Sequence, residues 1–421
     1  MDDQKHSKDS APEDLISRPF VLPCGQTVKN RLMKSAMSEA LGTADNHMTR
    51  GLVTLYGRWS AGGTGLLVSG NVMIDRRALG EPYNVAIEDE RDMELLCAWA
   101  RAGTQNSTQC WIQLNHPGKQ VPRGLNKESL APSAIPFRKE LQRFFVTPRE
   151  MTGAEIEDVL DRFARSAAIV KKAGFTGVQI HGAHGYLVSQ FLSPHHNRRT
   201  DIWGGSAQNR RRFLLEAFRR IRSVVGPAFP VAVKLNSADF QRGGFSEPES
   251  MEVIAALAAE GVDLVEISGG NYEAPAMSGA KVSDSTRERE AYFLEFARAA
   301  RNAVRVPLAV TGGFRTAGAM ARALADDSLD MVGMARPLAV DPDYASKILA
   351  GRPPTVTIRP ITTGIRFLDK TALMEVAWYS RQLRRMAKGK SPRPDESGLL
   401  SFIKVMVAST WRTSQTRRLR A

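Results

Sequence analysis

The chain is poor in cysteine. Its 421 residues contain three cysteines, Cys24, Cys97 and Cys110, which are scattered and form no CxxC pair. This spacing argues against a disulfide framework and against a cysteine-ligated iron–sulfur cluster. Few and unpaired thiols are typical of a reducing compartment, so we expect the protein to be cytoplasmic.

Long hydrophobic runs are also absent. No stretch reaches the roughly 18 apolar residues of a membrane span, so we expect no stable membrane insertion. Residues 1–18 are mostly polar and lack the apolar segment of a secretory signal, which predicts that they are disordered. Hydrophobic residues nevertheless make up 43% of the chain, enough for a substantial core.

Acidic residues are scarce near the end of the chain. Residues 366–421 contain 13 Lys and Arg but only 4 Asp and Glu, so they carry +9 of the net charge of +14. A basic tail could contact nucleic acid or an anionic membrane, or it could be a solvated extension or an oligomer contact. We favour the second pair of interpretations, which predicts no nucleic-acid partner and is compatible with a homo-oligomer.

Eight short apolar runs rich in β-formers alternate with segments of helical periodicity. The runs are Leu32–Met37, Gly65–Val72, Cys110–Leu114, Gly177–His181, Val231–Asn236, Leu264–Ser268, Pro307–Thr311 and Asp330–Gly333. The clearest helical segments are Asp89–Gly103, Ala154–Gly174, Gln208–Val225, Pro248–Gly261, Arg287–Val304 and Thr316–Asp326. This alternation predicts an α/β protein of the (β/α)8 TIM-barrel class over residues 19–360. The rival, a doubly wound sheet, usually carries a GxGxxG turn, and this sequence has none.

Two segments fall outside the regular alternation. Residues 116–151 separate the third strand from its helix, which is long for a barrel loop. They could form a lid or hairpin over the barrel mouth, or only a surface embellishment. Residues 361–421 follow the barrel, and we expect a helix over Leu368–Ala387 that packs on the barrel, followed by a poorly ordered basic tail.

The segment from His181 to Tyr186 has the composition of a reactive site. It reads His-Gly-Ala-His-Gly-Tyr and follows the fourth predicted strand, at the end of the barrel where active sites lie. Imidazole and phenol groups can hold an anionic oxygen and transfer a proton. Zinc binding would need a third ligand such as Glu266 or His116, but no HExxH spacing occurs. The histidines could also be a hydrogen-bonded pair in the core.

Other strand ends carry residues suited to a phosphorylated heterocycle. Gly312 and Gly313 stand between a strand and a helix, where backbone amides favour phosphate, and Arg336 at the eighth strand could add a charged fork. The Gln113 amide could meet the edge of a ring, and the Lys234 ammonium could stabilise negative charge on it. Alternatively, the glycines make a tight turn and Lys234 forms a structural ion pair.

Taken together, these motifs resemble the old yellow enzyme family of flavin-dependent ene-reductases, in its NADH:flavin oxidoreductase/NADH oxidase branch. The similarity runs from about Pro19 to Asp343. Its main blocks are Lys29-Asn30-Arg31-Leu32, Gln113 to Gly118, His181 to Leu187, Gln190 to Pro194, Asn197 to Asp201, Ser268 to Glu273 and Gly333 to Arg336.

The resemblance implies an FMN-binding barrel that takes electrons from NADH or NADPH. From the spacing of the histidines we expect no metal site. The implied FMN contacts are Ser35, Ala36, Met37, Ser38, Gly70, Gln113, Lys234, Gly312, Gly313, Ala335 and Arg336. His181 and His184 would grip the carbonyl oxygen of a substrate, and Tyr186 would deliver the proton.

The function implied by the resemblance is transfer of a hydride from NAD(P)H, through flavin, to an electron-poor alkene such as an α,β-unsaturated carbonyl compound. The alternative is an NADH oxidase or quinone reductase, in which oxygen or a quinone accepts the electrons. A third reading is a barrel that has lost its redox function and serves as a binding protein. The presence of His181, His184 and Tyr186 speaks against this third reading.

Overall fold

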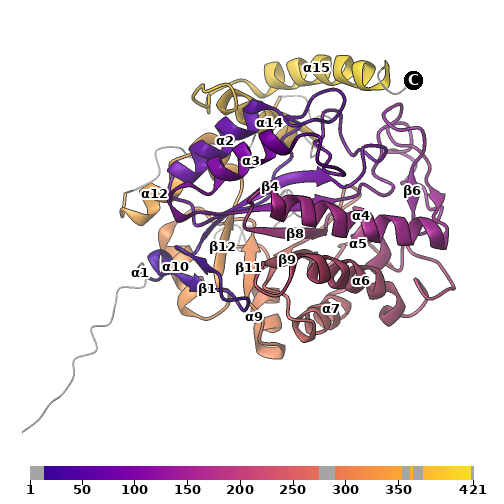
Figure 1. Ribbon diagram of the computed structural model, residues 1–421, viewed down its shortest axis with the longest axis horizontal. Coiled ribbons are helices and arrows are strands. Elements are labelled where there is room, and N and C mark those ends of the chain that lie inside the picture. Colours follow the sequence, from indigo (N-terminus) through magenta and orange to yellow (C-terminus); the bar gives the residue numbers. More distant parts are fainter. Residues whose placement is uncertain (1–13, 275–289, 353–360, 364–372, 419–421) are drawn as a thin grey trace, which may run out of the picture.

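The chain forms a closed barrel of eight parallel strands. A computed structural model describes residues 14–274, 290–352, 361–363 and 373–418. The barrel strands are β3 (Leu32–Lys34), β4 (Leu66–Met73), β5 (Gln109–Asn115), β8 (Gly177–Gly182), β9 (Val231–Asn236), β10 (Leu264–Ser268), β11 (Leu308–Thr311) and β12 (Met331–Met334). They pair in chain order, and β12 closes on β3. The predicted (β/α)8 barrel is confirmed, and each predicted strand overlaps an observed one (Figure 1).

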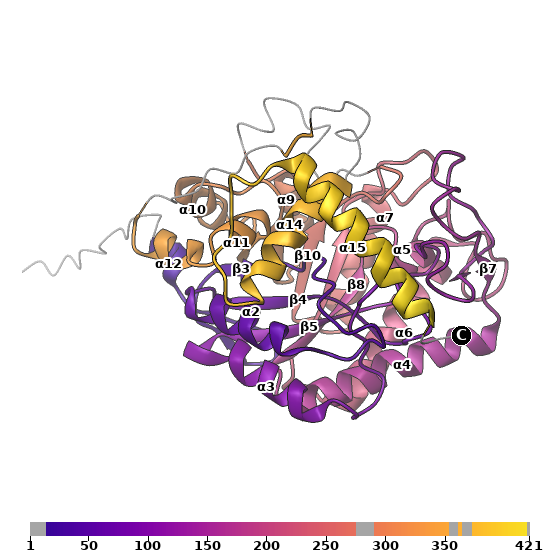
Figure 2. The ribbon, with the colours of Figure 1, turned by 90° about the horizontal axis from the view of Figure 1, so that it is seen from above.

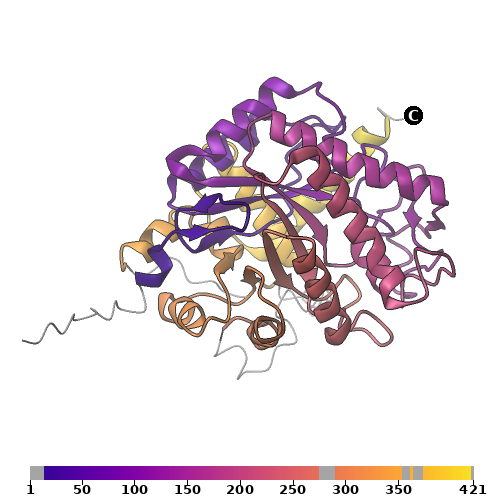
Figure 3. The ribbon, with the colours of Figure 1, turned by 60° about the horizontal axis from the view of Figure 1, so that its bottom comes forward.

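The inside of the barrel is layered because alternate residues of a strand share one face. At the amino-terminal end, Met33, Trp111, Ala232, Leu264 and Met331 belong to one buried apolar cluster. The hairpin formed by β1 (Phe20–Val21) and β2 (Thr27–Val28) supplies Leu22 and Val28 to the same cluster. Figure 3 shows this hairpin in front of the strands, so it plugs the end of the barrel opposite the expected site.

Helices surround the barrel and bury their apolar faces against it. They are α2 (Arg50–Ala61), α3 (Met93–Gly103), α4 (Gly153–Lys172), α5 (Leu187–Leu192), α6 (Ala207–Val225), α7 (Glu247–Ala259), α9 (Leu294–Ala303), α10 (Ala317–Ala325), α11 (Arg336–Val340) and α12 (Tyr344–Leu349), with a 3-10 turn at Gln105–Ser107. Thr152 and Ser246 each begin a helix with a capping box, which satisfies amides that the helix itself leaves unpaired. These helices and the outer faces of the strands make the main hydrophobic core.

The long segment after β5 folds onto the mouth of the barrel. Its strand β6 (Leu130–Ala131) pairs in parallel with β7 (Arg149–Glu150), and Pro122 bridges to Phe145. The Gln120 side chain donates a hydrogen bond to the backbone carbonyl of His184. The segment therefore braces a loop that carries a predicted site residue, instead of lying free on the surface.

Helices occupy the described parts of both terminal segments. The described part of residues 1–18 includes the short helix α1 (Asp14–Ser17), whose Ile16 is buried. The polar residues 1–13, on which the expectation of disorder rested, lie outside the described ranges. Helix α14 (Leu373–Met386) lies within the helix predicted beyond the barrel. The expected poorly ordered tail is instead helix α15 (Gly398–Arg418), which packs along the mouth side of the barrel (Figures 1 and 2). Within the described ranges, no helix combines the length and hydropathy needed to cross a bilayer.

Candidate active site

One cavity of about 300 Å³ lies at the carboxyl ends of the barrel strands. The sequence-predicted residues that line it are Ala36, Met37, Ser38, Gln113, His181, His184, Tyr186, Lys234, Gly312, Gly313, Ala335 and Arg336. Ser35 and Gly70 are not in its lining. The Ser35 hydroxyl hydrogen-bonds Thr311, and Gly70 sits in a bulge of β4, where its amide donates to Glu39 and Tyr56. The structure thus brings all but two of the predicted side chains to one cavity.

A polar layer forms the floor of this cavity. Gln113, Lys234 and Glu266 each stand two residues beyond an apolar residue of the inner cluster, so they point into the barrel one pleat closer to its mouth. The Gln113 amide donates to Gln179 at 2.8 Å, and Gln179 donates to Glu266 at 2.8 Å. These bonds orient the buried side chains before any ligand arrives.

Lys234 forms the structural ion pair that its sequence position suggested as one alternative. Its Nζ lies 3.0 Å from Glu266 Oε1 in a pair that is almost fully buried, and it also lines the cavity. Burial opposes ionisation of Glu266, but the Lys234 ammonium and hydrogen bonds from Thr311, Lys234 and Gln179 outweigh it and hold its pKa below the ordinary value. Glu266 therefore stays ionised and pairs with Lys234 at the cavity floor.

His181 and His184 lie together at the far end of the cavity. Their ring centroids are 5.2 Å apart. Burial, followed by the neighbouring His184 and Lys234, lowers the pKa of His181 well below its ordinary value. Burial and Lys234 do the same for His184, so both rings are neutral near pH 7. The Ala183 amide donates to Nδ1 of His181, which places the single ring proton on Nε2.

The backbone around His184 is held in an unusual conformation. Its φ is +60°, and its amide donates to the Asn236 side chain at 3.1 Å. Its Nε2 lies 2.7 Å from the Ser268 hydroxyl. Because Asn236 holds its backbone and Ser268 holds its ring, His184 is better described as a positioned polar group than as part of the apolar core.

Tyr186 packs against His181 in the same cavity. Its ring centroid lies 4.7 Å from that of His181, and its hydroxyl is 3.4 Å from the hydroxyl of Tyr272. Burial, then the proximity of Tyr272 and of Glu81, raises the pKa of Tyr186 well above its ordinary value. The phenol is thus fully protonated at neutral pH.

The opposite end of the cavity suits a phosphate group. Gly312 and Gly313 have φ of +124° and +98°, which favour glycine, and a Cβ on Gly313 would lie 2.6 Å from the Ala291 amide nitrogen. Arg336, in the first turn of α11, also lines this end. The exposed glycine backbone and the guanidinium line the same cavity, and together they are a donor set that fits the phosphate of FMN, while the polar floor fits its ring.

Sequence reasoning missed several residues of the cavity. Glu81 and Tyr272 line it, and the Ser38 hydroxyl donates to the Glu81 carboxyl. Removal from water raises the pKa of Glu81, although Ser38 and Arg384 oppose this. Tyr272 stands in a block that carried the resemblance, so its position after the β10 strand could have indicated it; nothing in the sequence singles out Glu81.

Helix α14 contributes a whole wall that no motif predicted. Its residues in the lining are Glu375, Val376, Tyr379, Ser380 and Leu383. Glu375 approaches Arg336 to 3.5 Å, and the Ser380 hydroxyl donates to the carbonyl of Ser38. The C-terminal segment therefore completes the cavity.

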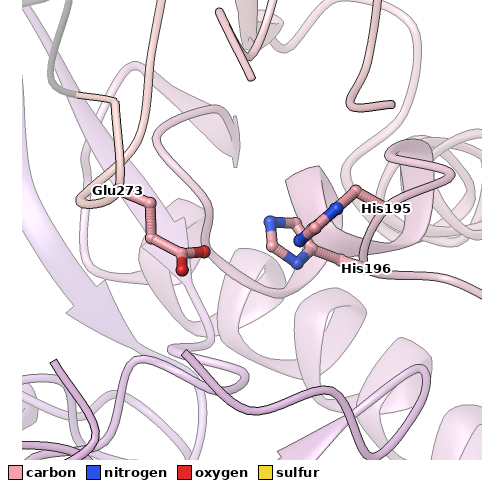
Figure 4. A group of neighbouring side chains, drawn as sticks. All are labelled: His195, His196 and Glu273. Carbon is pink, nitrogen blue, oxygen red and sulfur yellow. The ribbon is translucent and has the colours of Figure 1, made fainter. Parts of the chain in front are cut away.

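His195, His196 and Glu273 form a second group of polar side chains, outside the cavity lining (Figure 4). Their potential ligand atoms lie within 4.8 Å of one another, as in a metal site. The buried Lys119 ammonium, however, lies 3.2 Å from both Glu273 Oε2 and His196 Nδ1. A cationic group of the protein thus already occupies this cluster, which ties the segment after β5 to the loop after β10.

Comparisons with known proteins agree with this geometry. Residues 18–355 match the model of the NADH:flavin oxidoreductase / NADH oxidase family. The chain is similar to the NADH-dependent flavin oxidoreductase iliE of Hypocrea jecorina (37% identity, covering 77% of this chain and 86% of the relative). It is also similar to the NADH-dependent flavin oxidoreductase iccE of Talaromyces variabilis (33% identity, covering 89% of this chain and 98% of the relative).

Solved structures show the same architecture. A 2-naphthoyl-CoA reductase complex superposes with a TM-score of 0.76 at 25% identity, covering 88% of this chain but only 58% of the reductase chain. Morphinone reductase superposes with a TM-score of 0.68 at 23% identity, covering 82% of this chain and 91% of that chain. The chain is a member of the NADH:flavin oxidoreductase/NADH oxidase family, the old yellow enzyme family, and is an NAD(P)H-dependent oxidoreductase with FMN as its cofactor.

Proposed function

We propose that the enzyme reduces electron-poor alkenes, such as α,β-unsaturated carbonyl compounds. The observation that supports this most is the grouping of His181, His184 and Tyr186 in the cavity that also contains Lys234 and the Gly312–Gly313 turn. Two neutral imidazoles and a protonated phenol are suited to a substrate that needs an oxygen held and a carbon protonated.

The histidines would bind and polarise the substrate. The Nε2–H of His181 can donate to a carbonyl oxygen, and this bond strengthens as negative charge develops on that oxygen. Because burial keeps the imidazole neutral, His181 would act on the substrate as a neutral N–H donor and not as an imidazolium cation. FMN, when bound and reduced by NAD(P)H, supplies the hydride.

Tyr186 would supply the proton to the α-carbon. Its raised pKa keeps the proton on the phenol until a basic centre forms in the substrate. Asn71 and Tyr272 lie at hydrogen-bond distance from its hydroxyl and hold it in place. The Tyr186 phenol is neutral before it donates the proton and a phenolate afterwards, so it can act as the general acid for the α-carbon.

Replacing Tyr186 with phenylalanine tests the proposal. We expect Tyr186→Phe to slow alkene reduction by about 100-fold or more, because it removes the general acid. Reduction of FMN by NAD(P)H should stay nearly unchanged. Both half-reactions are measured anaerobically in a stopped-flow instrument, with a cyclohexenone-type acceptor.

Tyr272→Phe is the matched control, because it removes the neighbouring phenol of the same cavity. It should slow alkene reduction less than Tyr186→Phe does. Equal losses in both half-reactions of Tyr186→Phe would contradict the proton-donor role. Turnover with oxygen or a quinone, and none with any enone under nitrogen, would instead indicate an oxidase or quinone reductase.

A further inference from the structure

Helix α15 exposes a continuous apolar face. Its outward residues are Leu399, Leu400, Ile403, Met406, Val407 and Trp411, with exposed fractions from 37% to 67%. Their spacing places them on one side of the helix. Single apolar residues are common on protein surfaces, but six large apolar side chains on one exposed helix face indicate a contact surface.

The orientation of this face is set by what lies beneath the helix. Ser401 and Thr416 are fully buried on the inner side, and Phe402 packs against the main core. Arg412 donates to the carbonyl of Ala40 and lies over the ring of Tyr83. Because these contacts occupy the inner side, the apolar stripe has to face outward.

The charge of α15 indicates what the face binds. From Gly398 to Arg418 the helix contains no acidic residue, and besides the inward Arg412 its basic residues are Lys404, Arg417 and Arg418. Pairing this helix with its copy in a second chain would bring two sets of three positive charges together with no acidic residue of α15 between them. An anionic phospholipid surface complements both the apolar stripe and the basic residues.

We propose that α15 docks the enzyme on the surface of an anionic phospholipid membrane. The helix would lie in the plane of the interface, with its apolar stripe among the lipid headgroups and acyl chains. This mode is peripheral binding, so it agrees with the absence of a spanning helix from the described residues.

Docking in this orientation places the cavity close to the membrane. Helix α15 contacts the loops that follow β3 and β4 through Ala40 and Tyr83, and it packs on α14, which lines the cavity. Figure 2 shows α15 crossing in front of the barrel strands when this side is viewed face on. The mouth of the barrel, and not its plugged end, therefore faces the lipid.

Vesicle binding by the full-length FMN-loaded enzyme tests the proposal. The enzyme should co-sediment with phosphatidylcholine vesicles that contain about one-third phosphatidylglycerol and much less with phosphatidylcholine alone. Trp411 provides an internal reporter, because it is 58% exposed while the other five tryptophans are buried. Its fluorescence should shift to shorter wavelength on the anionic vesicles.

Two double variants distinguish vesicle binding through α15 from binding through exposed apolar residues elsewhere on the surface. Ile403→Ser with Val407→Ser keeps Trp411 and should lower vesicle partitioning at least about tenfold. Val21→Ser with Ile202→Ser removes side chains of similar exposure elsewhere (62% and 58%, against 51% and 67%) and should leave partitioning unchanged. Both variants should keep the flavin spectrum and the turnover of the parent without vesicles.

Several results would overturn the proposal. Failure of the parent enzyme to bind anionic vesicles would do so, as would equal losses in the two paired variants. A dimer in analytical ultracentrifugation that only Ile403→Ser with Val407→Ser dissociates, without vesicle binding, would assign the face to a second copy of the chain. Retention on DNA but not on vesicles would assign it to nucleic acid.

Discussion

The barrel floor and helix α15 depart from the usual distribution of polar and apolar residues in opposite directions. At the floor, a charged pair is buried, with 3% of Lys234 and none of Glu266 exposed. On α15, apolar side chains such as Val407 are exposed to 67%. The buried pair is satisfied by partners within the chain, whereas the apolar stripe is exposed among the residues that the structure describes. The buried pair therefore fits a role in the cavity inside the molecule, whereas the exposed apolar stripe indicates contact with another surface.

The largest effect should come from breaking the buried pair. Lys234→Met leaves the Glu266 carboxylate buried without its counter-ion, so we expect the free energy of unfolding to fall by about 3 kcal/mol. Affinity for FMN should fall as well, since Lys234 lines the cavity. Urea unfolding and flavin titration measure the two effects.

The double variant Lys234→Met with Glu266→Gln is the control for this effect. Removing the charge from Glu266 should restore most of the lost stability, because the remaining amide can still pair with Thr311 and Gln179. If the double variant is as unstable as Lys234→Met alone, the loss comes from packing and not from an unpaired charge.

The next effect concerns binding at the histidines. A phenol, whose oxygen stands in for that of the substrate, is the probe. His181→Ala with His184→Ala should weaken its binding to the FMN-loaded enzyme by about 10- to 100-fold, because the hydrogen bonds from both imidazoles to the phenolate oxygen are lost. The change in flavin absorbance on titration with a phenol measures this affinity. His195→Ala, outside the cavity lining, should leave it unchanged. Unaltered phenol affinity in the double variant would remove both histidines from the substrate site.

A smaller effect should appear in the dependence of stability on pH. The folded protein holds the pKa of His181 well below its ordinary value, so the unfolded chain gains a proton first as the pH falls below about 6.5. This contribution to stability is present above that pH and is lost as the pH falls further. One such histidine can change the free energy of unfolding by at most about 1.4 kcal/mol per pH unit.

Comparing the parent enzyme with His181→Gln isolates that contribution. Urea unfolding at pH 7.5 and pH 5.5, as approximate settings on either side of the ordinary histidine pKa, measures both proteins. The variant should lose less stability between the two than the parent. An identical loss in both proteins would show that His181 does not carry the effect.

The smallest effect should come from α15 without lipid. Ile403→Ser with Val407→Ser should change the free energy of unfolding by no more than about 0.5 kcal/mol, because exposed side chains contribute little. The same substitutions at the buried Val265 and Ile267 should prevent stable folding. A large loss of stability on α15 would mean that the stripe is covered within the folded chain.

Much of the barrel could be predicted because its signals are local. Each strand is a short run of β-formers, and alternation places Lys234 and Glu266 inside the barrel, each two residues beyond an inward apolar residue. The active-site segment from His181 to Tyr186 was visible because all its polar residues lie within six positions at the end of one strand. The prediction of a poorly ordered tail was wrong because the apolar run there is short and is interrupted by Lys404. Such a run does not indicate which side of a helix would be buried.

By itself, the sequence determined the eight-stranded barrel and the placement of His181, His184 and Tyr186 at its mouth. These follow from residues that are neighbours along the chain. The tertiary structure alone decided the contacts of Ser38 with Glu81 and of Tyr186 with Tyr272, which are 43 and 86 residues apart. It also decided that α14 closes the cavity, through a hydrogen bond that joins residues 342 positions apart, and that α15 turns its apolar face outward. Such contacts depend on how distant segments pack, and no local periodicity encodes them.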